Sequence, residues 1–355
     1  MSNRPLIESS GLRWIIGIAG ILIIVAALKA AEAIVIPMML ALFISIISLP
    51  PLRWLIRHGV PSAVAILLIL AVVIGMGSIL TLIVLSSVDT LMLRLPEYQE
   101  RLTNTLLNIL PQLEPMGLSL ERETIVEQLN PAQALDLVGR AISGLGNVLT
   151  GTFLVTFIVL FILLEQASLP TKLRQALPNA ERSFANTNGF IRQVNRYLVI
   201  KTSVSLVTGL IIGSWLWWLG VDFAVLWGLL AFLLNFIPNI GSLLAAIPAV
   251  LLALLQLGFA DATLVALGYI AVNIVLGALI EPRLMGRGLG LSPLVVFLSL
   301  ITWGWLFGPV GMLLSIPLTM ILKIALEQNP STRWIGIMLS HVRAEDTQDQ
   351  TSEKS

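Results

Sequence analysis

The apolar tract "NFIPNIGS" carries three polar side chains around a Pro/Gly break: Asn235, Asn239 and Ser242. An asparagine side chain both donates and accepts hydrogen bonds, so this set suits a small hydroxylated solute or an ion. Where a membrane helix is broken, its free N–H groups favour anionic groups and its free carbonyl groups favour cations. The alternative is that these side chains only cap the two ends of a broken helix.

A carboxylate and an arginine follow another apolar stretch, which ends at Ile280. Glu281 and Arg283 could form an ion pair at a membrane edge, or Glu281 could act as a gate or titrate during proton coupling. Asn273 is the one amide inside the stretch. It could hydrogen-bond a neighbouring helix or line a solute path.

A second Pro/Gly break, in "TWGWLFGPVG", supplies the other candidates for a solute path. They are Thr302, Trp303, Gly308, Pro309 and Gly311, and the first break adds Pro238 and Gly241. A tryptophan in a membrane protein is by default an interface anchor, but Trp303 could instead lie over a bound ligand. Asp222 and Asp261 lie at the expected outer boundary, where they should cap helices.

The composition places these residues in a membrane protein. Of the 355 residues, 57% are hydrophobic and 12% are charged. Soluble domains carry about 25% charged residues, so this chain could not cover a globule with polar surface. Its net charge of +1 gives no field that would attract nucleic acid.

Several kinds of chemistry are excluded by residues that the sequence lacks. With no cysteine and two histidines, it offers no disulfide, Cys/His zinc site or iron–sulfur cluster, and no cofactor is expected. No Walker-type phosphate loop is present. No predicted span holds the paired acids or the Ser–His pair of an intramembrane protease, so no enzyme activity is expected.

Apolar tracts long enough to cross a hydrocarbon core of about 30 Å recur along the chain. We expect an all-α polytopic membrane protein with about six full spans, at 12–30, 33–49, 62–86, 147–164, 199–219 and 262–280. Two paired tracts remain, 223–236 with 240–257 and 294–307 with 310–326. The first limb of each pair is only about 21 Å long as a helix, so each pair is expected to form a broken hairpin.

Lysine and arginine mark the expected cytoplasmic side. They gather after the second span, between Glu165 and Lys201, after Ile280 and near the C-terminus. The polar insert 88–146 has more acids than arginines and should lie outside as a small helical unit. Both termini are therefore expected in the cytoplasm, with an uncleaved first span.

The expected organisation has five parts. They are a three-span scaffold (1–87), the external helical insert (88–146), a span with a basic amphipathic cytoplasmic segment (147–196), a transport core (197–340) and a disordered polar tail (341–355).

The two breaks form a weak internal repeat. "FIPNIGSLLAAIP" matches "FGPVGMLLSIP" when Pro238 is aligned with Pro309 and Gly241 with Gly311. Each copy follows a full span, and the charge pattern opens the first hairpin from outside and the second from inside. The two units are therefore inverted, an arrangement that in transporters surrounds a midplane site. The alternative is a chance match, because proline and glycine are common in membrane helices.

The tract "NFIPNIGS", the tract "EPRLMGRGLGLSPLVVFLSLITWGWLFGPVGMLLSIPLT" and the order of the segments resemble the autoinducer-2 exporter family of bacterial permeases. The resemblance covers about residues 12–340. It implies a multi-pass permease of the bacterial inner membrane that exports a small molecule, the quorum-sensing furanone precursor being the named substrate. It also implies a homo-oligomer of pentameric form, and some relatives are described as sodium/proton antiporters.

The expected function is a secondary transporter that exports a small polar solute, such as autoinducer-2, by alternating access through the two broken hairpins. The expected partners are that solute, membrane lipid and a coupled sodium ion or proton. A sodium/proton antiporter and a passive channel or scaffold are the alternatives. No acid lies at the centre of a predicted span, which disfavours a strongly proton-coupled pump.

Overall fold

The computed structural model is helical throughout the residues that it describes, which are 10–113, 152–166, 172, 180–238, 240–285, 290–328 and 330–340. Within these ranges no strand occurs, as expected for an all-α protein. The second half of the expected insert, residues 167–171 and 173–179 of the expected cytoplasmic segment and the tail 341–355 lie outside the described residues.

The described helices follow one another in a simple order. They are α1 (Ser10–Ala30), α2 (Glu32–Arg57), α3 (Ser62–Leu113), α6 (Thr152–Glu165), α8 (Ala180–Leu219), α9 (Ala224–Leu234), α10 (Gly241–Leu257), α11 (Phe259–Val272), the π-helix η3 (Asn273–Ile280), α12 (Glu281–Met285), α13 (Pro293–Leu313), α14 (Ser315–Gln328) and α15 (Arg333–Met338).

Five described helical stretches are long and apolar enough to cross a membrane: Glu32–Arg57, Ser62–Leu91, Gln193–Leu219, Phe259–Met285 and Pro293–Leu313. The shorter apolar helices are Ile15–Ala30, Phe153–Glu165, Ala224–Leu234 and Gly241–Leu257. The chain is therefore built as a multi-pass membrane protein. One expected hairpin limb, 294–307, belongs to a helix of spanning length.

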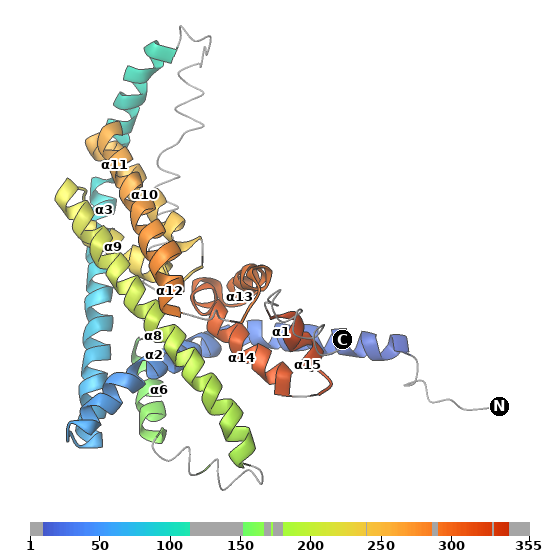
Figure 1. Ribbon diagram of the computed structural model, residues 1–355. Coiled ribbons are helices and arrows are strands. Elements are labelled where there is room, and N and C mark those ends of the chain that lie inside the picture. The colour runs from blue at the N-terminus through green and yellow to red at the C-terminus, as the bar shows by residue number, and fades with distance from the viewer. Residues whose placement is uncertain are drawn as a thin grey trace, which may run out of the picture.

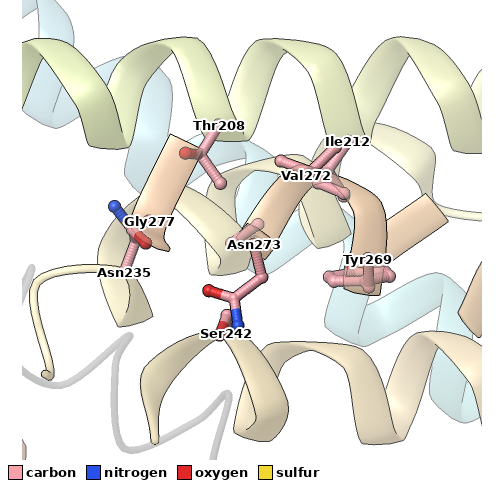
Figure 2. A pocket seen from close by; sticks show the side chains of 9 residues that line it. Thr208, Ile212, Asn235, Ser242, Tyr269, Val272, Asn273 and Gly277 are labelled. Carbon is pink, nitrogen blue, oxygen red and sulfur yellow. The ribbon is translucent and has the colours of Figure 1, made fainter. Parts of the chain in front are cut away.

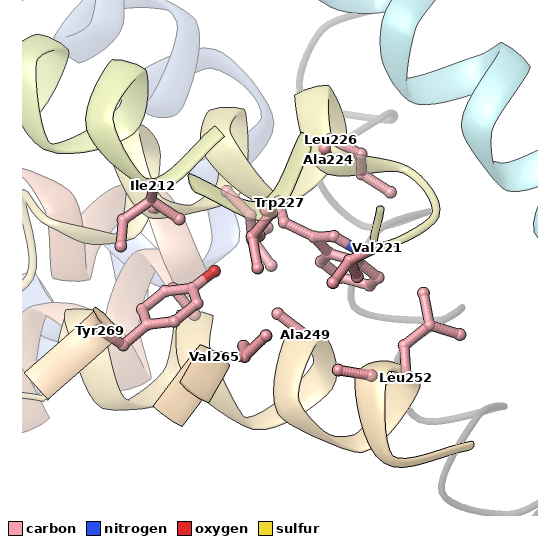
Figure 3. Close-up of a cluster of buried hydrophobic side chains, with 14 of the residues drawn as sticks. Ile212, Val221, Ala224, Leu226, Trp227, Ala249, Leu252, Val265 and Tyr269 are labelled. Carbon is pink, nitrogen blue, oxygen red and sulfur yellow. The ribbon is translucent and has the colours of Figure 1, made fainter. Parts of the chain in front are cut away.

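Three buried clusters hold the helices together. The first joins α3 with α8, α9, α10 and α11; the second joins α2, α3 and α6; the third joins the middle of α8 to α14. In Figure 1, α3 runs upright along one edge and α8 crosses the molecule diagonally, while the N-terminal end of α1 points away from the other helices. The first cluster contains both limbs of the first expected hairpin, α9 and α10 (Figure 3).

Glycine allows α8 and α9 to approach each other at backbone distance. A Cβ atom on Gly209 would lie 2.7 Å from the carbonyl oxygen of Gly228, and one on Gly228 would lie 2.9 Å from the Cα of Gly213. Small residues at such crossings let membrane helices pack closely without a hydrophobic driving force. The first limb of the hairpin is therefore fixed against α8 along its middle.

The first break is a tight turn between α9 and α10. A Cβ atom on Gly241 would overlap the carbonyl oxygen of Leu234, with the carbonyl carbon at 2.6 Å, and would lie 3.2 Å from the Ile237 Cβ. The chain can return this closely onto the end of α9 only because Gly241 has no side chain.

The second break also contains a glycine that closely approaches the preceding helix. A Cβ atom on Gly311 would overlap the carbonyl oxygen of Trp303, with the carbonyl carbon at 2.7 Å, and would lie 3.0 Å from the Phe307 Cβ. The kink within α13 falls at Phe307 and Gly308, and Gly308 has φ 61° and ψ −146°, a region that only glycine occupies readily. The alignment of Gly241 with Gly311 thus pairs two glycines that serve the same steric purpose.

Candidate functional site

A small cavity with both polar and apolar lining residues lies beside the first break, between α8, the hairpin and the α11–η3 helix (Figure 2). Its lining residues are Thr208, Ile212, Ala231, Asn235, Ser242, Tyr269, Val272, Asn273 and Gly277. Three of them, Asn235, Ser242 and Asn273, are among the residues that the sequence proposed for a solute path. No charged side chain lines the cavity.

The cavity is small in this structure. The centre of a water-sized molecule has about 10 Å³ in which to move, which is room for about one water molecule. A solute with a sugar-sized ring would therefore enter only after the surrounding helices move apart.

Asn235 fastens the tip of the hairpin to α8. Its Nδ2 donates to the Ser205 Oγ at 2.9 Å, and the residue is buried. Asn235 follows the last residue of α9, but its side chain bonds α8 and not a helix end, and α10 has no side-chain cap, so the expectation that these side chains only cap the broken helix is wrong. Asn239, the other asparagine of the tip, lies outside the described residues.

Asn273 begins the π-helix η3. A Cβ atom on Gly277 would lie 3.0 Å from the Asn273 Oδ1, so the carboxamide covers Gly277. Figure 2 shows the same carboxamide directed toward Ser242. π-Helical turns are rare and often occur at functional sites. The wider helix therefore presents its one amide to the hairpin across the cavity.

Tyr269 is a cavity residue that sequence reasoning missed. Its side chain is 5% exposed, and its hydroxyl has no hydrogen-bond partner among the residues that the structure describes. A buried polar group without a partner is uncommon in a native structure. The position offered a signal, because Tyr269 precedes Asn273 by four residues and therefore shares its helix face.

Glu281 forms an ion pair with Lys201 of α8. The sequence alone indicated only that Lys201 belongs to a basic cytoplasmic stretch. Lys201 Nζ lies 2.7 Å from Glu281 Oε1 and 2.9 Å from Oε2, and the side chains are 7% and 15% exposed. The side chain of Arg283 is exposed instead. The proposed pairing of Glu281 with Arg283 is therefore replaced by a contact between residues 80 positions apart.

These residues form two facing rows, which we call the polar seam. On α8 the row is Lys201, Ser205, Thr208 and Ile212; on the antiparallel α11–η3–α12 helix it is Glu281, Gly277, Asn273 and Tyr269. The spacing of three or four residues keeps each row on one helix face. The ion pair ends the seam, and the cavity occupies its other part.

The candidates at the second break do not line this cavity. Trp303 donates from Nε1 to the Thr319 Oγ1 at 2.9 Å and stacks on Phe307, so it holds the kinked helix against α14. Lys29 donates to the carbonyl oxygen of Leu306 at 3.1 Å, beside the kink. The remaining candidates, Thr302, Gly308, Pro309, Gly311, Pro238 and Gly241, are likewise absent from the cavity lining.

Asp222 binds α3, and the expectation that its side chain caps a helix is wrong. Its Oδ2 accepts hydrogen bonds from Arg94 Nη1 at 2.8 Å and from the Tyr98 hydroxyl at 2.6 Å. α9 has Phe223 before its first residue and no side-chain cap. Asp261 lies in the first turn of α11, where its negative charge interacts favourably with the helix dipole. Its side chain does not cap the helix.

The Tyr98 contact gives a pH prediction. Burial, followed by the hydrogen bond to Asp222, raises the pKa of Tyr98 from its usual value to about 12. Because the folded pKa is above the unfolded value of about 10, the stabilisation is complete below pH 10 and is lost as the pH rises through about 12. We expect the tyrosinate absorbance that is lost in Tyr98→Phe to appear only near pH 12. Titration of this absorbance near pH 10 in the folded protein would contradict the prediction.

A multi-pass helical chain with polar side chains beside a Pro/Gly break between two apolar helices is typical of membrane transporters. The chain belongs to the family described as "AI-2E family transporter", whose family model matches residues 16–331. The resemblance noted in the sequence is thereby confirmed, and the family is one of transporters.

Curated relatives cover nearly the whole chain. The AI-2 transport protein TqsA of Escherichia coli (strain K12) is 42% identical over 343 residues, which are 96% of this chain and 99% of the relative. A protein of Haemophilus influenzae named "Putative transport protein" is 39% identical, covering 93% of this chain and 97% of the relative. The "Putative transport protein YhhT" of E. coli K12 is 35% identical, covering 95% and 97%.

Proposed function

We propose that the protein is a secondary transporter that exports a small polar solute across the bacterial inner membrane. The observation that carries the proposal is the cavity lined by Asn235, Ser242, Asn273 and Tyr269, whose hydroxyl has no partner among the described residues. Autoinducer-2 is the first solute to test, because the relative TqsA is named as its transport protein. A neutral lining of amides and hydroxyls suits an uncharged hydroxylated solute.

The proposed mechanism is alternating access, in which the two hairpins move against the other helices. The cavity is too small for a ring-shaped solute, so loading requires the hairpin tip to leave α8. At its tip the first hairpin is hydrogen-bonded to α8 through Asn235 and Ser205. The matching glycine geometry at Gly241 and Gly311 supports two related hairpins. Their entry from opposite faces, with both termini in the cytoplasm, follows from the lysine and arginine pattern.

Reconstitution tests the transport proposal. Purified protein in proteoliposomes would be given autoinducer-2 and a panel of neutral, anionic and cationic solutes, with and without sodium and pH gradients. We expect saturable flux of a neutral hydroxylated solute. Saturable transport restricted to charged solutes would contradict the proposal.

The buried carboxylate of Glu281 is the observation that favours the second candidate, a sodium/proton antiporter. That function predicts pH-dependent sodium flux that is lost in Glu281→Gln. Solute flux without any ion gradient would argue against it. A passive channel or scaffold predicts flux that does not saturate.

The homo-oligomer, a pentamer in the family pattern, is also a proposal. Native mass spectrometry of the protein released from detergent should give five times the 38.5 kDa mass of one chain. A monomer under the conditions that preserve transport would overturn it.

Removal of the Tyr269 hydroxyl should weaken solute binding. The hydroxyl has no hydrogen-bond partner among the described residues, so we expect it to hydrogen-bond the solute. Tyr269→Phe should therefore raise KM by about fivefold. The melting temperature in detergent should stay the same or rise, because the variant buries no unpaired hydroxyl there. The control is Tyr98→Phe, which lies outside the cavity and should leave KM unchanged. An unchanged KM in Tyr269→Phe would show that the hydroxyl does not bind the solute.

A further inference from the structure

The fold does not need an ion pair at the end of the polar seam, because apolar side chains could pack in its place. A charged side chain within a membrane-spanning segment is costly and marks a functional position by default. Replacement of a buried ion pair by well-packed apolar residues is often neutral or stabilising. Lys201 and Glu281 lie in two helices of spanning length, and both side chains are largely buried. The pair therefore requires an explanation other than attachment of one helix to another.

The position of the pair relates it to the cavity. Along α8, Lys201 precedes Ser205 by four residues and Thr208 by seven, a separation of about 10 Å along the helix axis. On the facing helix, Glu281 follows the cavity residue Gly277 by four residues. The pair thus lies beyond the hairpin tip, at the end of the seam that the charge pattern assigns to the cytoplasm.

The pair also ends the π-helix. Glu281 is the residue directly after η3, and the η3 residues Asn273 and Gly277 line the cavity. If a π-helical segment converts to an α-helix, every later residue in the helix rotates about the helix axis. The direction of the Glu281 side chain is therefore coupled to the geometry of the cavity wall. Physical coupling between two sites requires an element that can adopt two discrete arrangements.

We propose that Lys201 and Glu281 form a clasp that keeps the cavity too narrow for a solute and opens during each transport cycle. While the pair is intact, it holds the end of η3 against α8. When the pair separates, η3 can move away from α8 and widen the cavity beside Ser242, which is half-buried in this structure. This inference rests on the proposed function, since it concerns access to the same cavity.

A second contact lies beside the clasp and defines its extent. Arg196 of α8 donates from Nη2 to the carbonyl oxygen of Leu284 in α12 at 3.2 Å. This bond is exposed, whereas the bonds of the ion pair are partly buried. The clasp proper is therefore the charged pair, and we expect Arg196→Met to have a smaller effect than a change at Glu281.

The chain has no native cysteine, so the reactivity of a single introduced cysteine can report how accessible the cavity is. Ser242→Cys would be introduced as a single reporter, and its reaction with a polar maleimide would be timed in lipid nanodiscs without any solute. Glu281→Gln keeps the size of the side chain and removes its charge. We expect it to raise the labelling rate by about tenfold, and the charge exchange Lys201→Glu with Glu281→Lys should return the rate toward the starting value. A labelling rate unchanged by Glu281→Gln would overturn the clasp, as would an exchanged pair that labels as fast as Glu281→Gln.

A cross-linking experiment separates a moving clasp from a fixed contact. In Lys201→Cys with Glu281→Cys, a short bifunctional thiol reagent should stop transport in proteoliposomes, and a reductant that cleaves the reagent should restore it. Full transport by the cross-linked protein would show that the two positions need not separate. The labelling result does not depend on any solute, so failure of the autoinducer-2 assay and failure of the clasp are distinguishable.

Discussion

Replacement of Gly241 by alanine should abolish transport and lower the amount of protein in the membrane. The new Cβ atom would overlap the carbonyl group at the end of α9, and the backbone there is held by the packing of α9 on α8. Overpacking costs about 1–3 kcal/mol of folding free energy, and occasionally more, and a fixed backbone leaves little room for relaxation here. The cavity would lose its wall, since Asn235 and Ser242 lie on the two sides of the turn. Solute flux and membrane yield measured together test this result.

A matched control is available within α3. Gly75 has no atom near the position of an added Cβ, so Gly75→Ala should leave flux unchanged and stabilise the helix by about 0.5–1 kcal/mol. Gly311→Ala provides the parallel experiment at the second break and should resemble Gly241→Ala. If Gly241→Ala transports as well as Gly75→Ala does, the tight turn is not part of the transport machinery.

Replacement of Lys201 alone by methionine should cause the largest loss of stability among changes at the polar seam. It leaves the Glu281 carboxylate buried without its partner, which costs about 3–5 kcal/mol in buried pairs of other proteins. The double change of Lys201 and Glu281 to methionine should recover most of this loss, because no charge remains buried. Thermal unfolding in one detergent, followed by circular dichroism, compares the two variants.

The control for the ion pair is an exposed pair of the same kind. Lys172 and Glu165 form an ion pair with both side chains exposed, and exposed pairs contribute about 0–1 kcal/mol. Lys172→Met should therefore change the melting temperature little. Equal losses in Lys201→Met and Lys172→Met would mean that the Lys201 pair is not effectively buried in the membrane protein.

The sequence predicted the parts of the site that depend on local pattern. The helical class followed from composition, and the breaks at Pro238 and Pro309 followed from proline and glycine in apolar tracts. Asn235, Ser242 and Asn273 were recognisable because amides and hydroxyls are conspicuous in such tracts. Their meeting in one cavity needed the structure, since they come from three helical elements.

The remaining features depend on contacts that no local pattern contains. Lys201 and Glu281 are 80 residues apart, so their pairing follows only from the antiparallel packing of α8 and α12. The π-helix that begins at Asn273 has the same residue types as an apolar α-helix, and its sequence shows no distinct periodicity. Asp222 was placed correctly at a helix boundary, but its partners on α3 are more than 120 residues away.

Protection of the cavity by its solute tests the central claim most directly. The single-cysteine variant Ser242→Cys would be labelled with maleimide in proteoliposomes while autoinducer-2, or the solute that reconstitution identifies, is raised in concentration. We expect the solute to slow labelling, with half-protection at the KM for transport, and we expect Asn273→Ala to remove that protection. Undiminished labelling at solute concentrations that saturate transport would contradict it, because the solute would then cross the protein without occupying this cavity.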